Sequence, residues 1–228
     1  MSMTNAAANV ASLEKEASER AQFTLRMRSR GLGDLRVLRA LERTPRSFFV
    51  PQRYADIAAR DIALPIGAGQ TAPPPSTVAA MIEALRLEAS HRVLEIGTGS
   101  GYAAALLGQI AAEVVSLERC PSLAVEATAR LAAFGLGNVK VRHADALADA
   151  PDDGAEFDRI LVHALIEPPA PRLTRRLRPG ASLVAAIVDE DVQRIVRLTR
   201  EADGELSGDA FGQVRTLTGL SVGLMRAL

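Results

Sequence analysis

The sequence is poor in the residues that carry several common functions. It has no tryptophan, two tyrosines and one cysteine, Cys120, in 228 residues. So few aromatic side chains give no stacking surface for single-stranded nucleic acid, and a lone cysteine excludes a disulfide within the chain. The histidines lack the spacing of metal ligands, so we expect no metal site; they are His91, His143 and His163.

The sequence also lacks an excess of charge and a long apolar run. Lysine and arginine number 27, as do aspartate and glutamate, so charge gives no reason to expect nucleic acid or an anionic membrane as a partner. No run approaches the roughly 20 apolar residues of a membrane-spanning helix. Residues 1–20 show neither the basic start nor the hydrophobic stretch of a signal peptide. We therefore expect a cytoplasmic protein, and the sequence leaves its oligomeric state open.

What the sequence does contain is enough apolar material for a core, since 48% of its residues are hydrophobic. Residues 12–30 and 34–43 show helical patterns, and each pattern ends at a glycine or before a proline. An irregular stretch follows over residues 51–75 and ends in three consecutive prolines. A further helical pattern, TVAAMIEAL, comes directly after it. The N-terminal third is thus predicted to be helical on both sides of an irregular segment.

From residue 91 onward, short apolar runs alternate with helical patterns. The runs have the length and composition of buried strands and cover residues 91–96, 113–118, 138–145, 157–165 and 181–188. The helical patterns cover residues 101–112, 121–135 and 169–177. This alternation predicts an α/β fold with a mostly parallel sheet and right-handed crossovers. Strand patterns at 191–200 and 214–226, around a turn signal at 202–209, predict an antiparallel C-terminal edge.

A glycine-rich turn, LEIGTGSGY over residues 94–102, carries the strongest chemical signal. It follows a predicted strand and begins a predicted helix, the context in which a ligand approaches the backbone closely. Its order is G-x-G-x-G, and Tyr102 occupies the place where a dinucleotide fingerprint has its third glycine. The order resembles motif I of class I methyltransferases. That resemblance implies bound S-adenosylmethionine and helices on both faces of the sheet.

Two carboxylates follow the next two predicted strands. Glu118 ends the second strand, where it can accept hydrogen bonds from both ribose hydroxyls, and Asp145 follows the third strand, near the expected adenine. Taken singly, the glycines fit a tight turn, and each carboxylate fits a helix cap or a solvated loop. Taken together, they predict a cofactor site at three consecutive strand ends, with these candidate residues: Glu95, Gly97, Thr98, Gly99, Gly101, Glu118, Asp145 and Ala146.

Longer segments resemble one methyltransferase family, protein-L-isoaspartate O-methyltransferase, over about residues 24–190. The segments are RGLGDLRVLRALERTPRSFFVP, ALPIGAGQT, RVLEIGTGSGY and GLGNVKVRHAD. The resemblance implies an N-terminal helical cap and methyl transfer to the α-carboxylate of an isoaspartyl residue in a damaged protein or peptide. The ester then closes to a succinimide without the enzyme, and hydrolysis returns some normal aspartate.

The resemblance also implies where the acceptor binds. The PIGxGQT loop of the family lies over the active site, which assigns the acceptor contacts to Gly69, Gln70, Thr71 and the nearby backbone amides. An ionised carboxylate needs no general base near pH 7, so orientation by hydrogen-bond donors is the expected catalytic contribution. We accordingly expect residues 1–75 to form the cap and substrate loop. Residues 76–228 would form the cofactor-binding domain, and the two would make one structural unit.

Departures from the family pattern gather on the acceptor side. Pro73 replaces a serine whose hydroxyl, as the resemblance implies, contacts the carboxylate, and VHAL at residues 162–165 replaces a Val-Thr-Ala-Ala-like run. The C-terminal segment VRTLTGLSVGLM also matches the family weakly. Two alternatives stay open. One is a methyltransferase with a different acceptor and His163 as a general base, although His163 also fits a packed strand-end residue. The other is a cofactor-binding module without catalysis.

Overall fold

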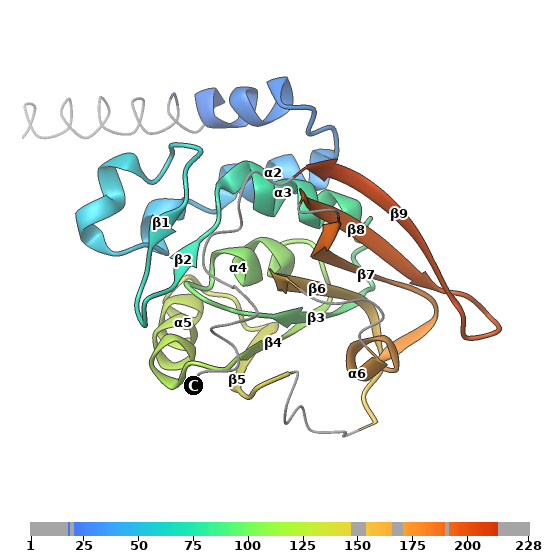
Figure 1. Cartoon of the computed structure of the whole chain (residues 1–228). Coiled ribbons are helices and arrows are strands. Elements are labelled where there is room, and N and C mark those ends of the chain that lie inside the picture. The colour runs from blue at the N-terminus through green and yellow to red at the C-terminus, as the bar shows by residue number, and fades with distance from the viewer. Residues whose placement is uncertain (1–17, 19–20, 147–153, 166–170, 190–191, 214–228) are drawn as a thin grey trace, which may run out of the picture.

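The computed structural model describes residues 18, 21–146, 154–165, 171–189 and 192–213 (Figure 1). Seven strands of this part of the chain form one sheet in the order β5-β4-β3-β6-β7-β8-β9. The strands are β3 Arg92–Ile96, β4 Glu113–Glu118, β5 Val139–His143, β6 Phe157–Leu165, β7 Leu177–Asp189, β8 Val192–Arg200 and β9 Leu206–Gln213. The pairs from β5 to β7 are parallel, and β7–β8 and β8–β9 are antiparallel. The predicted α/β class and antiparallel edge are confirmed.

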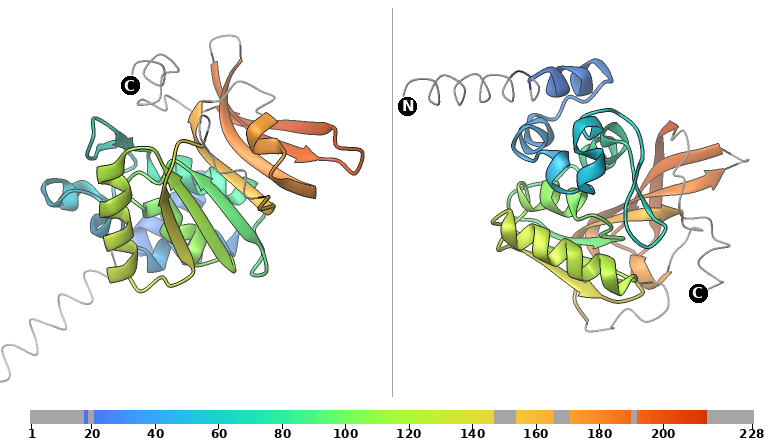
Figure 2. Two further views of the ribbon diagram at one scale, coloured as in Figure 1. Left: turned by 90° about the horizontal axis from the view of Figure 1, so that it is seen from below. Right: turned by 90° about the vertical axis from the view of Figure 1, so that its left-hand side faces the viewer.

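Helices lie on both faces of this sheet. They are α2 Leu35–Arg43, α3 Pro75–Ala84, α4 Tyr102–Gly108, α5 Pro121–Ala133 and α6 Pro171–Thr174. Residues of α2, α3, α4 and α5 share one buried cluster with Val93 and Leu161 of the sheet. Leu173 of α6 belongs to a second cluster with Leu94 and its neighbours. Successive residues of β3 therefore face opposite layers, as the pleat of a strand requires. Figure 2 shows the antiparallel strands at one end of the sheet.

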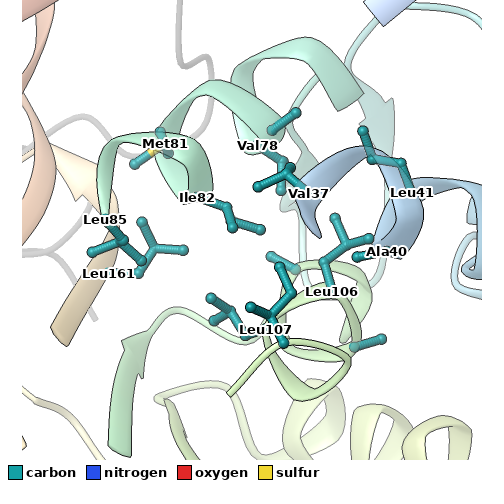
Figure 3. Close-up of a cluster of buried hydrophobic side chains, with 14 of the residues drawn as sticks. Val37, Ala40, Leu41, Val78, Met81, Ile82, Leu85, Leu106, Leu107 and Leu161 are labelled. Carbon is teal, nitrogen blue, oxygen red and sulfur yellow. The ribbon is translucent and has the colours of Figure 1, made fainter. Parts of the chain in front are cut away.

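The N-terminal helices and the rest of the chain share one hydrophobic core. Figure 3 shows Val37 and Leu41 of α2 directed at side chains of α3 and α4, among them Ile82 and Leu106. Ile82 and Leu106 are fully buried, and burying such a side chain stabilises a fold by about 1.5–3 kcal/mol. The shared core makes the cap part of the same structural layer as the helices that follow it.

Local hydrogen bonds fix the entry into α2. The Asp34 side chain caps the helix by accepting from the Arg36 N–H at 2.8 Å. Glu83, near the end of α3, accepts from the N–H groups of Gly33 and Asp34 through Oε1. The sequence predicted α2 with nearly these bounds, and the carboxylate of α3 links it to the core. A helix also runs over residues 21–29, within the predicted segment 12–30, the first part of which lies outside the described residues.

The segment expected to be irregular has defined elements. Residues 51–75 contain a 3₁₀ helix, η2 Gln52–Ile57, and a short antiparallel hairpin of β1 Leu64–Pro65 with β2 Thr71–Ala72. Another 3₁₀ helix, η1 Arg46–Phe48, precedes them. Periodicity cannot reveal strands of two residues, which is why the sequence showed no element here.

The C-terminal edge differs from its prediction in the residues that form its last strand. Strand β9 begins inside the predicted turn at residues 202–209, because the connection from β8 is only residues 201–205. The Glu201 N–H donates to the Glu205 carbonyl at 2.8 Å, and Gly204 has φ +90°. The predicted strand at 214–226 lies outside the described residues. The predicted helix at 169–177 is shorter in the structure, where α6 ends at Thr174 and β7 begins at Leu177.

No helix within the described ranges combines the length and the apolar content that a membrane crossing needs.

Candidate functional site

A cleft of about 920 Å³, including the part open to solvent, lies at the carboxyl ends of the parallel strands. Strand β3 pairs with β4 on one side and with β6 on the other. The strands that follow β3 are therefore added first on one side of it, as β4 and β5, and then on the other side, from β6 onward. Open α/β sheets bind ligands at such a reversal of strand order. The cleft has two walls: the strand ends with their loops, and the β1–β2 hairpin with the residues after it.

The glycine turn passes close to the hairpin at Gly99 and close to α5 at Gly101. Gly99 has φ +53°, and a Cβ atom on it would lie 3.3 Å from Cδ1 of Ile66 in the hairpin. Gly101 has φ +88° and precedes α4, and a Cβ atom there would lie 3.4 Å from Cβ of Ala127 on α5. A side chain at either position would strain the backbone, and it would crowd the cleft at Gly99 and α5 at Gly101. Glycine at these positions therefore keeps the turn close to the hairpin and to α5.

Glu118 organises the turn from the end of β4. Its Oε2 accepts from the Gly99 N–H at 2.8 Å, and its Oε1 accepts from the Cys120 N–H at 2.8 Å. The residue is 5% exposed and lines the cleft. Each carboxylate oxygen has two lone pairs, so both oxygens keep acceptor capacity for a ligand hydroxyl. The carboxylate thus holds the glycine turn and faces the cleft at the same time.

Glu95 lies behind the cleft wall in a buried polar network. It is fully buried; Ser116 Oγ donates to its Oε2, and His163 Nε2 lies 3.1 Å from its Oε1. Thr98 Oγ1 is hydrogen-bonded to the same Ser116 hydroxyl. The Glu95 carboxyl group therefore joins the Ser116 hydroxyl to the His163 ring. The network connects the ends of β3, β4 and β6 beneath the glycine turn.

His163 lines the cleft near the end of β6. Nε2 is engaged by Glu95, and Nδ1 is buried without a hydrogen-bond partner in the described part of the chain. A general base must come within hydrogen-bond reach of the proton that it removes. The contact with Glu95 fits a packed strand-end residue, and the Nδ1 atom without a partner beside the cleft fits the alternative of a general base.

Most of the predicted site residues meet in this cleft. Its lining includes Gln70, Thr71, Gly97, Thr98, Gly99, Glu118, Asp145 and Ala146. Gly69, Glu95 and Gly101 lie outside the lining. The sequence analysis missed the apolar part of the wall, formed by Ile66, Ala72, Ile96, Leu117 and Leu123. Ile96 ends β3 and Leu117 directly precedes Glu118. Their positions next to predicted site residues were the one sequence signal that could have placed them in the cleft.

Some polar groups of the hairpin wall form hydrogen bonds within the hairpin itself. The Ile66 N–H donates to the Gln70 carbonyl at 2.8 Å, and the Gln70 N–H donates to the Gly67 carbonyl at 3.0 Å. Gln70 Nε2 donates to the Ala68 carbonyl at 3.3 Å. Ala68 and Gly69 both have positive φ, of 54° and 66°. The backbone amide of Gln70 therefore closes the turn, and a ligand must take its hydrogen bonds from other groups of this wall.

Arg46 is a buried residue at this wall that the sequence analysis did not single out. It is 4% exposed, and its Nη2 donates to the carbonyls of Ala72 and Pro73 at 3.3 and 2.9 Å. Burial lowers the pKa of its guanidinium to about 10, so it keeps its charge near pH 7. No periodicity or spacing in the sequence distinguishes this arginine from the other 26 lysines and arginines.

Comparisons with known proteins agree with this geometry. Residues 19–221 match the family model described as "Protein-L-isoaspartate(D-aspartate) O-methyltransferase (PCMT)". A relative from Rhodopseudomonas palustris (strain HaA2), "Protein-L-isoaspartate O-methyltransferase 1", is 48% identical over 189 residues, which cover 82% of this chain and 76% of the relative. The "Protein-L-isoaspartate O-methyltransferase" of Azorhizobium caulinodans is 44% identical over 203 residues, covering 89% of this chain and 93% of its own.

A solved structure shares the fold. The crystal structure of a putative protein-L-isoaspartate O-methyltransferase from Plasmodium falciparum, in complex with S-adenosyl-L-homocysteine, has a TM-score of 0.75 and 20% identity. The match covers 88% of this chain and 96% of that one. The family match over most of the length, together with relatives above 40% identity, shows that this chain belongs to the protein-L-isoaspartate(D-aspartate) O-methyltransferase family.

Proposed function

We propose that this protein is an S-adenosylmethionine-dependent carboxyl O-methyltransferase that acts on L-isoaspartyl residues of damaged proteins or peptides. One observation carries the proposal: a single cleft joins the glycine turn and the strand-end carboxylates to the PIGxGQT hairpin. The first wall fits the methyl donor, and the second fits an acceptor presented over it. Family membership supports the same donor and the same acceptor.

The strand-end wall fits S-adenosylmethionine residue by residue. Gly97, Thr98 and Gly99 let the ligand approach the backbone, and Glu118 keeps lone pairs on both oxygens for the ribose hydroxyls. Asp145 and Ala146 follow β5, where the adenine would lie, and Ile96 and Leu117 supply apolar contact. Glu95 supports this wall through Ser116, and Gly101 lets α4 begin close to α5. The bound donor supplies a methyl group already activated by its sulfonium.

The hairpin wall has to orient the acceptor rather than change its protonation. A carboxylate is ionised near pH 7, so the protein contributes position and the exclusion of water. Gly69, Gln70 and Thr71 form the turn and the start of β2 beside the cleft. We assign the acceptor contacts to this segment. Because Gln70 N–H already closes the turn, the remaining polar groups of residues 67–71 have to hold the carboxylate.

Pro73 predicts a slow enzyme. It lines the cleft where the family has a serine, and proline has neither a hydroxyl nor an N–H. Loss of one hydrogen bond to a charged group costs about 1.5–3 kcal/mol. That loss corresponds to roughly a 10- to 150-fold weaker interaction, at about 1.4 kcal/mol for each factor of ten.

Two segments of the chain have different roles in this proposed function. Residues 1–75 supply the cap and the acceptor hairpin, and residues 76–228 supply the cofactor-binding sheet. Their common cluster around Val37, Ile82 and Leu106 supports treating them as one structural unit. Isoaspartyl proteins and peptides are the proposed partners, and the cytoplasm is the proposed location.

Transfer of a labelled methyl group tests the proposal. The protein is incubated with methyl-labelled S-adenosylmethionine and either an isoaspartyl peptide or the same peptide with aspartate, and binding of S-adenosylhomocysteine is measured in the same preparation. We expect base-labile label on the isoaspartyl peptide alone. Cofactor binding without label on that peptide would refute isoaspartyl methylation and would direct the search to other acceptors.

A further inference from the structure

A buried guanidinium connects the acceptor hairpin to the segment before it. Arg46 follows α2 in the 3₁₀ helix η1 and has 4% of its surface exposed. Its Nη1 donates to the carbonyls of Ala58 and Arg60 at 3.2 and 3.4 Å. Its Nη2 lies 3.1, 3.3 and 2.9 Å from the carbonyls of Ile62, Ala72 and Pro73. The contacts span both ends of the hairpin.

Arg46 has five carbonyl partners, all of them from the backbone. Nη2 has two N–H groups and three carbonyl partners, so at least one N–H is shared between two carbonyls. Within the described residues, no carboxylate pairs with Arg46. Its Nη1 and Nη2 are held by backbone carbonyls, and its Nε is buried without a hydrogen-bond partner there. Buried charges are normally paired. A charge that is solvated only by backbone carbonyls holds those carbonyls together, since loss of any of them leaves it less compensated.

The carbonyls in question belong to the acceptor wall. Ala72 ends β2, and Ala72 and Pro73 both line the cleft. Pro73 has no N–H with which to anchor itself in a strand or helix, so its carbonyl is its one backbone hydrogen-bonding group. Arg46 supplies the partner at 2.9 Å. The segment in which the family serine is replaced is therefore held from behind by this guanidinium.

The segment that carries Arg46 also reaches the first residue of α4. The ring of Phe49, the residue directly after η1, lies 5.9 Å from the ring of Tyr102. Tyr102 lines the cleft directly after the glycine turn. Arg46 thus contacts the hairpin wall directly, its η1 segment packs on Tyr102 through Phe49, and Arg46 itself is not part of the lining.

We propose that Arg46 is a positioning residue that sets the distance and shape of the acceptor hairpin relative to the glycine turn. The inference rests on the proposed function for the identity of the acceptor. Lysine offers three N–H groups on one nitrogen and cannot span carbonyls on two sides as the planar guanidinium does. Loss of the planar guanidinium should weaken binding of the acceptor while the cofactor wall stays intact.

The test compares Arg46→Lys and Arg46→Gln with Arg43→Lys, a control at an exposed arginine of α2. For Arg46→Lys we expect the KM for an isoaspartyl peptide to rise about tenfold, the size of one lost hydrogen bond. The Kd of S-adenosylhomocysteine should stay within about twofold, since the cofactor contacts are unchanged. Arg46→Gln should show at least the same rise in KM, and Arg43→Lys should match the wild type.

Hydrogen exchange provides a second readout that needs no acceptor. In both Arg46 variants, exchange at the amides of Ile66 and Gln70 should accelerate about tenfold, because the hairpin opens more often. Exchange in β3 and β4 should not change. If wild-type protein fails to methylate isoaspartyl peptide, the proposed function fails, and this arm still decides the role of Arg46.

Two results would overturn the inference. One is unchanged KM and unchanged hairpin exchange in Arg46→Lys, which would mean that charge alone suffices. The other is a parallel acceleration of exchange in the hairpin, β3 and β4 with loss of cofactor affinity, which would show that Arg46 only stabilises the fold in general. Thermal unfolding with bound S-adenosylhomocysteine confirms that each variant is folded under the assay conditions.

Discussion

Replacing Glu118 with glutamine should weaken cofactor binding strongly. The wild-type carboxylate accepts from Gly99 N–H and Cys120 N–H, both at 2.8 Å, and has lone pairs left for the ribose. Glutamine has one oxygen and an NH₂ group. One backbone N–H would then face another donor, and the ribose would lose a charged acceptor.

The size of the effect follows from these contacts. A hydrogen bond to a charged group contributes about 1.5–3 kcal/mol, so loss of the ribose contact alone predicts a roughly 10- to 150-fold higher Kd. The unpaired backbone N–H adds about 1–3 kcal/mol of destabilisation to the free protein. Unfolding of the variant without ligand measures that second contribution separately.

Calorimetric titration with S-adenosylhomocysteine measures the Kd. Glu113→Gln is the matched control, because Glu113 begins the same strand at the end away from the cleft and pairs with Arg92 and Lys140. These partly exposed ion pairs contribute about 0–1 kcal/mol, so the control should bind the ligand like the wild type. A folded Glu118→Gln protein with wild-type Kd would refute the assigned role of the carboxylate.

Three further predictions address the turn, the hairpin and the cap. Gly99→Ala should lower the free energy of unfolding by about 1–2 kcal/mol, because φ +53° disfavours a side chain. Denaturant titration measures this, and an unchanged unfolding midpoint would contradict it. Pro73→Ser should raise kcat/KM for isoaspartyl peptide by about tenfold or more, and unchanged kinetics would place the acceptor elsewhere. Asp34→Ala should cost about 1 kcal/mol of stability near pH 7. A hydrogen bond from the Arg36 side chain holds the pKa of Asp34 below its ordinary value of 3.8, so the wild-type advantage is present above pH 3.8 and disappears as pH falls through the lower folded pKa. Unfolding at several pH values measures this, and a constant advantage down to strongly acidic pH would contradict it.

The parallel sheet and its strand-end residues were predictable from the sequence for a physical reason. A buried strand followed by a tight turn and a helix is a local pattern, and parallel strands bring their carboxyl ends to one edge of the sheet. Glu118 and Asp145 could therefore be placed beside the glycine turn before any contact was known. The structure brings both residues into one cleft with Gly97 and Gly99.

The hairpin and its support could not be predicted in the same way. Strands of two residues leave no periodic signal, and the contacts of Arg46 join backbone carbonyls of residues 12 to 27 positions later in the chain. Backbone carbonyls are present at every residue, so no residue type marks the partners. Glu95 was predicted beside the cofactor from its place in the motif, whereas the structure places it in a buried network with Ser116 and His163.

Conversion of an isoaspartyl peptide into its aspartyl isomer tests the central claim most directly. The peptide is incubated with the protein and S-adenosylmethionine, and the two isomers are separated by chromatography over time. The account predicts that the aspartyl isomer accumulates only when both protein and S-adenosylmethionine are present, and that Glu118→Gln slows its formation at limiting cofactor. An isoaspartyl peptide that stays unchanged beside folded, cofactor-binding protein would contradict the claim.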